Sequence, residues 1–247
     1  MRIYNRALDA TQVSNLYNGL PIGPGAGPGT VVLDTSGYSA PLDLTIAEPA
    51  DIQWLAGTGL HVIADTKIVS PGPATKLFNA LTATNKMTLE AIFTPQDVSQ
   101  GGPARIVSYS ADPSVRNFTL GQSQTRYDQR LRTTTTSSNG IPSTTSDYVL
   151  TTAPQHVVVT YNGGEVRLYR NGALEKRQSR TGTFNWNSSY RFMLANEDTN
   201  DRPWLGQLHG VAIYDQALNA VQSANLFDGL TPGDGRLNYR LRWLEQP

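Results

Sequence analysis

One stretch decides the fold class: His156-Val157-Val158-Val159-Thr160-Tyr161, the turn Asn162-Gly163-Gly164, and Glu165-Val166-Arg167-Leu168-Tyr169-Arg170. β-branched and aromatic residues fill the first run, and the second run alternates apolar with polar side chains, a pattern typical of paired strands. The turn contains an Asn-Gly pair, and a second pair follows at Asn171-Gly172, where such residues favour hairpin turns with positive φ. The pattern predicts an antiparallel hairpin with Val166 and Leu168 facing the core and Arg167 and Tyr169 facing outwards or into a groove.

The composition of the 247 residues favours an all-β fold. The chain contains 22 Gly, 15 Pro and only 16% charged residues, which is typical of many short strands and turns. Its formal net charge is zero, so no global field would attract nucleic acid. No apolar run approaches the roughly 18 residues of a membrane helix. We therefore expect no nucleic-acid partner and no membrane insertion, and the absence of Cys excludes disulfides and thiolate catalysis.

The two ends of the chain repeat one segment. Residues 3–10, IYNRALDA, align with residues 213–220, IYDQALNA, at a constant offset of 210. Each copy predicts a strand, an Asp or Asn N-cap and a short amphipathic helix that ends at a glycine. The simplest organisation is a tandem array. We then expect the closing strand and helix of a preceding module at 1–20, a Gly/Pro linker at 21–29 and one complete domain at 30–230.

Residues 231–247 contain a further linker and an alternating run from Leu237 to Leu244 that predicts a strand. This strand either opens the next module of an array or completes the sandwich of its own chain. A third alternative is that it fills a neighbouring copy by strand addition. That alternative predicts self-association through residues 237–244.

Several segments resemble laminin-G-like modules in the order of that family. Met87 to Pro95 and the hairpin at 156–172 resemble two of its strands, Asp34-Thr35-Ser36-Gly37 resembles its opening turn, and Gly210 to Leu218 resembles its last strand. The resemblance implies an antiparallel two-sheet jelly-roll sandwich of the concanavalin A-like lectin/glucanase type, with short helices after the Ile-Tyr closing strands.

Other segments resemble a variant of this module found in large bacterial surface or envelope proteins; they are residues 102–108, 116–122, 130–134, 194–197 and 202–206. The resemblance implies an extracellular or cell-envelope location. It also implies a glycan or an extracellular protein as the partner.

Five arginines gather between residues 105 and 132, where Asp112 and Asp128 are the only acids. On a sheet face they would bind sulfate or uronate groups of acidic polysaccharides through bidentate contacts. The alternative is a structural network with Asp112, Asp128 and Glu197. The candidate ligand-binding residues are Arg105, Arg116, Gln122, Arg130, Arg132, Asn196, Arg202 and Trp204. Arg126 joins the face of Arg130 and Arg132 if this segment is one strand.

Two tryptophans are flanked by polar residues. Trp204 follows Arg202-Pro203, and Trp186 lies between two asparagines. An exposed indole would stack on a sugar ring, whereas burial in the core is the alternative for either residue.

Residues 196–201, Asn-Glu-Asp-Thr-Asn-Asp, concentrate the oxygen ligands that Ca²⁺ prefers. They make Asn196, Asp198 and Asp201 candidate ligands of one Ca²⁺, and Asp34 near the opening turn is a second candidate. The alternative is a solvated turn, since no EF-hand spacing is present. No other cofactor is expected.

No strand carries the paired carboxylates that glycosidases of this fold need, because Glu90 stands alone in its strand and Glu197 follows one. We therefore expect a non-catalytic carbohydrate-binding module of a bacterial extracellular or envelope protein, with acidic or sulfated glycans as ligands. One alternative is a structural repeat or strand-exchanging fibre subunit. The other is a divergent polysaccharide-degrading enzyme.

Overall fold

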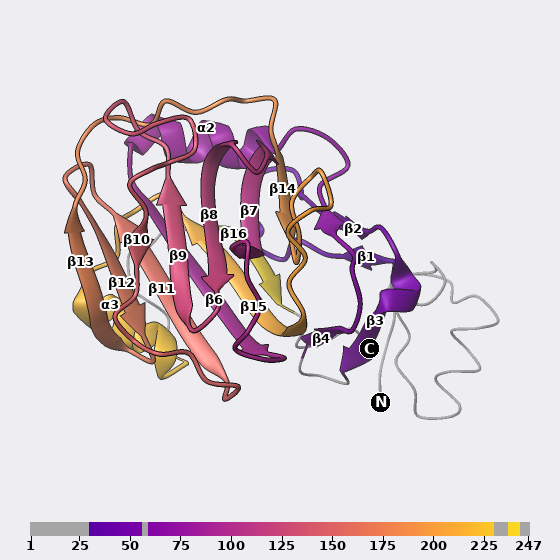
Figure 1. Cartoon of the computed structure of the whole chain (residues 1–247). Helices are drawn as coiled ribbons and strands as arrows, with labels where there is room; N and C mark the ends of the chain where they lie inside the picture. The colour runs from indigo at the N-terminus through magenta and orange to yellow at the C-terminus, as the bar shows by residue number, and fades with distance from the viewer. Residues whose placement is uncertain (1–29, 56–58, 230–236, 243–247) are drawn as a thin grey trace, which may run out of the picture.

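The computed structural model describes residues 30–55, 59–229 and 237–242, and it places two antiparallel sheets face to face (Figure 1). The jelly-roll sandwich predicted from the sequence is confirmed. The first sheet runs in the order β1 (Val31–Val32), β2 (Leu44–Ile46), β5 (Ile68–Val69), β14 (Arg191–Leu194), β7 (Ala104–Asp112), β8 (Val115–Ser123), β9 (Arg126–Leu131), β10 (Thr144–Thr145). The second sheet runs in the order β13 (Ala173–Ser179), β12 (Glu165–Arg170), β11 (Gln155–Tyr161), β6 (Met87–Pro95), β15 (Gly206–Tyr214), β4 (Gly59–Val62), β3 (Ile52–Leu55).

The hairpin β11–β12 forms as the sequence predicts. Asn171 and Gly172, at the turn into β13, have φ of 48° and 78°, which the Asn-Gly pair tolerates with little strain. Val166 and Leu168 are fully buried between the sheets. Tyr169 points away from the other sheet, as predicted, and it is only 1% exposed. A helix covers that side of the second sheet.

The covering helix is α3 (Ala220–Phe227). Its N-cap is Asn219, whose side chain accepts from the backbone of Gln222 while the Gln222 side chain accepts from the Asn219 backbone, a capping box. Leu218 and Leu226 pack with Tyr169 in a small apolar cluster on this side of the second sheet. The strand-to-helix unit predicted for residues 213–229 is therefore confirmed.

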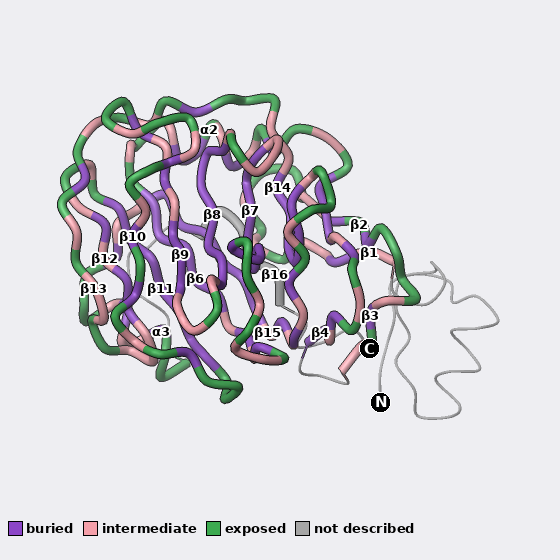
Figure 2. The backbone as a smooth tube through the Cα atoms, viewed as in Figure 1, coloured by how far each residue is buried: buried purple, intermediate pink, exposed green. Residues whose placement is uncertain are grey.

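A larger apolar core lies between the two sheets, and Figure 2 shows buried backbone along most of β7 and β8. The helix α2 (Thr75–Thr84) adds Leu77 and Leu81 to this core. The short 3₁₀ helix η1 (Pro49–Asp51) leads into β3. No helix among the described residues is long and apolar enough to cross a membrane.

The terminal strand β16 (Leu237–Arg242) pairs antiparallel with β15 of its own chain. Its register runs from Tyr214 opposite Leu237 to Gly210 opposite Arg242. β4 pairs with the other half of β15, at Gly206–Leu208. Of the three alternatives for this strand, the structure shows pairing within the chain. The predicted partial module at 1–20 and the linker at 21–29 lie outside the described residues, as do Trp243 and Leu244 of the predicted self-association segment.

Candidate functional site

The register of three neighbouring strands gathers polar side chains on the first sheet. Arg105 of β7 pairs with Gly121 of β8, which pairs with Asp128 of β9, and the next row is Ser108, Thr119 and Arg130. Because Phe118 and Leu120 of β8 lie in the core and side chains alternate along a strand, these rows lie on the side turned away from the second sheet. We call Arg105, Arg116, Asp128, Arg130 and Glu197 the arginine cluster.

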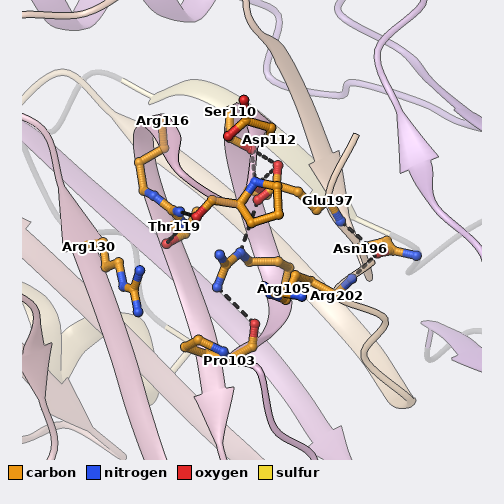
Figure 3. A network of polar contacts seen from close by, with 12 residues as sticks. Pro103, Arg105, Ser110, Asp112, Arg116, Thr119, Arg130, Asn196, Glu197 and Arg202 are labelled. Carbon is orange, nitrogen blue, oxygen red and sulfur yellow. Dashed lines mark hydrogen bonds and ion pairs between the residues drawn. The ribbon is translucent and has the colours of Figure 1, made fainter. Parts of the chain in front are cut away.

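Glu197 occupies the centre of the cluster, and it comes from the segment between β14 and β15. Its Oε2 accepts from Nε of Arg105 at 3.1 Å, and its Oε1 accepts from Oγ of Ser108 at 3.2 Å and from Oγ of Ser110 (Figure 3). The Glu197 side chain is 0% exposed and that of Arg105 is 1% exposed. A buried ion pair needs such additional hydrogen bonds to offset the cost of removing both charges from water.

Gly121 lies beside this pair, where β7 and β8 approach closely. A Cβ at this position would lie 2.8 Å from the carbonyl oxygen of Ala104 and 3.1 Å from Cβ of Pro103. Any other residue would therefore push against the backbone of β7. The distance from such a Cβ to Nη1 of Arg105 would be 3.6 Å, an ordinary contact.

Arg116 is fully buried but has no carboxylate of its own. Its Nη2 donates to the carbonyl of Pro113, its Nη1 makes a long contact of 3.4 Å to Oγ1 of Thr119, and its Nε has no partner. Burial lowers the pKa of Arg116 to about 9, and the charges of Arg105 and Arg130 add to this effect. Arg116 therefore still carries its charge at neutral pH.

Arg130 is the part of the cluster that solvent reaches. Its side chain is 15% exposed, its Nε donates to Oδ1 of Asp128 at 2.7 Å, and its Nη1 donates to Oδ1 of Asn139 at 2.8 Å. With three guanidiniums and two carboxylates, the cluster has a net charge of +1. The structural alternative, in which arginines pair with Asp128 and Glu197, is confirmed for Arg130 and Arg105.

The structure corrects the sugar-stacking interpretation of the tryptophans. Trp204 is 0% exposed, its Nε1 donates to Oε1 of Gln122 at 3.0 Å, and its ring meets Phe93 edge-on. Trp186 donates from Nε1 to the carbonyl of Arg132 and stacks on Phe184 at 4.2 Å between ring centroids. Neither indole presents a face to a ligand, because both complete the core.

Gln122 and Asn196 also serve the fold. Both side chains belong to residues that are 0% exposed. Nε2 of Gln122 donates to the carbonyls of Asp97 and Gln124, and Oδ1 of Asn196 accepts from the backbone N–H groups of Glu197 and Arg202. The polar atoms of these two predicted ligand-binding residues are therefore already used inside the protein.

The remaining predicted arginines are spread out. Arg126 shares the face of Arg130 but donates to the carbonyls of Ser146 and Asp147. Arg132 lies beyond the end of β9, so the expected row of three arginines on one strand does not form. Arg202 is half-buried, and its Nη1 donates to the carbonyl of Asp201.

The four predicted calcium ligands have separate partners. The Asp34 carboxylate accepts from Lys76 and from the backbone of Ser36 and Leu42, whereas Oδ1 of Asp198 pairs with Lys67 and Arg191. Among the described residues, no three His, Asp or Glu side chains form a group that could hold a metal ion. These side chains do not form a ready-made calcium site.

Sequence reasoning missed a polar group on the second sheet, beneath α3. Oε1 of Glu90 lies 3.0 Å from Nε2 of His156, and Oε2 accepts from the Tyr214 hydroxyl at 3.1 Å. These residues come from β6, β11 and β15, and only the strand register brings them together. The sequence offers no signal for this contact beyond the lone carboxylate of β6.

Comparison with known proteins gives a family and a fold. A laminin-G family model described as the concanavalin A-like lectin/glucanases superfamily matches residues 71–222. Comparison with curated protein sequences gives no match.

Solved structures share the fold at low identity. The receptor-binding domain of the botulinum neurotoxin C/D mosaic serotype superposes with a TM-score of 0.58 at 14% identity, over 81% of this chain and 51% of that chain. Botulinum neurotoxin type C, a toxin whose cell entry depends on interaction with two ganglioside molecules, superposes with a TM-score of 0.57 at 13% identity. The match covers 81% of this chain and 51% of that chain. Trypanosoma rangeli sialidase in complex with 2,3-difluorosialic acid superposes with a TM-score of 0.57 at 14% identity, over 86% of this chain and 35% of that chain.

The chain thus spans about half the length of the toxin chains it matches. The family model, in contrast, covers more than half of this chain, and its fold agrees with the two sheets described above. The chain therefore belongs to the concanavalin A-like lectin/glucanase superfamily.

Proposed function

We propose that the chain is a non-catalytic carbohydrate-binding module that recognises acidic glycans at the outward side of the first sheet. The observation that carries this proposal is the arginine cluster, in which three guanidiniums face only two carboxylates and the Arg130 side chain is 15% exposed. A glycan carboxylate or sulfate would supply the missing negative charge, and guanidinium pairs well with both groups.

The structural neighbours support a glycan as the ligand. One neighbouring toxin depends on ganglioside molecules for cell entry, and another neighbouring structure contains a sialic acid derivative. The family resemblance supports a bacterial extracellular or cell-envelope location for the module. We extend both properties to this chain as parts of the proposal.

The ion-pair partners of the two carboxylates in the cluster support a binding role rather than catalysis. A glycosidase needs one protonated carboxyl group and one ionised group on either side of the scissile bond. Glu197 and Asp128 instead each form an ion pair with a guanidinium, Glu197 with Arg105 and Asp128 with Arg130. Glu197 is also enclosed by the protein, so it has no open path to a sugar oxygen.

A glycan array that includes sulfated and uronic polysaccharides tests this function. We expect Arg130→Ala to weaken binding of acidic glycans at least about tenfold, in line with the loss of a charged hydrogen bond. Arg177→Ala is the matched control, because Arg177 is a 65% exposed arginine on β13 of the other sheet. Equal binding by both variants, or no glycan binding by the unaltered chain, would contradict the proposal.

A structural repeat is the second candidate function. It is favoured by the duplication of residues 3–10 at 213–220 and by the position of β16 at an edge of β15. Light scattering of the chain with and without residues 231–247 tests it. A monomer in both cases would exclude assembly through the terminal strand.

A further inference from the structure

The sandwich closes on one side where β10 of the first sheet meets β13 of the second (Figure 1). Gln178 pairs with Val166 and Lys176 pairs with Leu168. Val166 and Leu168 lie in the core, and cross-strand partners share a face, so these β13 side chains also point inwards. The inner face of this side is therefore polar, unlike the rest of the core.

Arg180 continues this inward row one residue past the end of β13. Its backbone N–H donates to the carbonyl of Gly164 at 2.9 Å, which extends the pairing with β12. The residue is only 4% exposed. Its Nη2 donates to the carbonyl of Pro142, so the side chain links the end of β13 to the segment that precedes β10.

The Arg180 guanidinium is incompletely satisfied. Nε and Nη1 are buried without a hydrogen-bond partner, and within the described part of the chain Arg180 forms no ion pair. The carboxylates near β13 have other partners: Glu165 pairs with Arg167 and Arg177, and Asp147 pairs with Lys176. Burial lowers the pKa of Arg180, and Tyr161 acts in the opposite direction.

Further unpartnered polar atoms lie on the neighbouring strands. Thr144 of β10 follows two residues after Pro142, and it pairs with Gln129 of β9. Thr144 is 0% exposed and Gln129 is 1% exposed, yet Oγ1 of the first and Oε1 of the second have no partner. A hydroxyl, an amide and a guanidinium can each donate to an anion, once the amide is turned to present its nitrogen.

We propose that this closed side of the sandwich is an anion site, in which Arg180 binds a small monovalent anion such as a halide. Water alone would satisfy the unpartnered N–H groups of Arg180, but it would leave the positive charge of the guanidinium without a counter-charge. A buried ion without a counter-charge is costly. Arg105 and Arg130 solve the same problem with carboxylates, and Arg180 has none. The anion stabilises the junction of β10 and β13, and this role is independent of glycan binding at the arginine cluster.

Thermal unfolding of the whole chain tests the anion site. Chloride replaces gluconate at constant ionic strength and neutral pH, for the unaltered chain, Arg180→Met and Arg177→Met. We expect the folded-to-unfolded ratio of the unaltered chain and of R177M to rise tenfold for each tenfold rise in chloride above the dissociation constant. R180M should show only the general salt effect that all three share.

Crystals of the unaltered chain grown with bromide give a second readout that does not depend on the folding of a variant. An anomalous peak within hydrogen-bond distance of Arg180 Nε or Nη1 is expected, and formate should weaken it by competing for the same donors. No anomalous peak at Arg180, or an equal chloride response in R180M, would overturn the proposal.

Discussion

Replacing Glu197 with Gln tests the arginine cluster most directly. The substitution keeps the shape of the side chain but removes the counter-charge of Arg105, so three guanidiniums would face Asp128 alone. It also places an amide N–H₂ where an oxygen now accepts from Arg105, Ser108 or Ser110. Breaking a fully buried pair in this way costs about 3–5 kcal/mol.

Such a loss is a large fraction of the roughly 5–15 kcal/mol by which domains are usually stable. Equilibrium urea denaturation followed by circular dichroism measures the free energy of unfolding of the variant. A second substitution, Arg116→Met, removes one of the three guanidiniums. It should therefore cost about 1 kcal/mol less in the E197Q background than in the unaltered chain, as expected for charges in one network.

Either of two results would contradict a charge network in this cluster. One is a loss of less than about 1 kcal/mol for E197Q, which would mean that Arg105 does not need the Glu197 charge as its counter-charge. The other is additive behaviour of E197Q and R116M, since residues of one charge network couple.

Three further predictions concern residues that fix the fold. Burial alone raises the pKa of Asp34, but hydrogen bonds from Lys76, Leu42 and Ser36 lower it overall. Because the pKa of Asp34 is lower in the folded than in the unfolded chain, the ionised carboxylate stabilises the fold fully at pH values above the unfolded pKa. This stabilisation is lost as the pH falls through the folded pKa. Asp34→Asn should therefore cost about 1–3 kcal/mol at pH 7, and urea denaturation near pH 3 should show a smaller difference from the unaltered chain. Asn219→Ala removes the capping box of α3 and should cost about 1 kcal/mol, seen as a lower melting temperature; an unchanged melting temperature would show that packing alone holds the helix. Trp204→Phe leaves Oε1 of Gln122 buried without its donor and leaves a void, so it should cost about 2–4 kcal/mol in the same denaturation assay, and a loss below about 1 kcal/mol would mean that Gln122 finds another partner.

Local signals in the sequence predicted the fold well. The Asn-Gly pairs identified the hairpin turns, and the Asn219 N-cap identified the start of α3, because both signals depend on residues close together in the chain. The burial of Tyr169 has a non-local cause. Alternation along β12 gives the side of the sheet, but it does not show that a helix that begins 51 residues later, at Ala220, covers that side.

The candidate site was predicted only in part for the same reason. The count of arginines correctly indicated a positively charged region, and Arg105, Arg116 and Arg130 do come together. Flanking polar residues suggested that Trp204 was exposed. Its indole is instead buried in the core, where it donates to Gln122, 82 residues away in the sequence. No pattern in the sequence indicated that Arg180 is buried without an ion pair among the described residues. That property depends on which carboxylates lie next to the other arginines in the folded chain.

The shared edge of β15 has a consequence for assembly. β4 pairs with Gly206–Leu208 and β16 with Gly210–Tyr214, so the hydrogen-bonding groups along this edge are occupied in both halves. A strand from a second molecule would have to displace one of them first, because no free stretch of that edge remains among the paired residues. Release of β16 would then be a first-order step that precedes association. The rate at which two monomers exchange strands should level off as protein concentration rises, at the rate constant of that release.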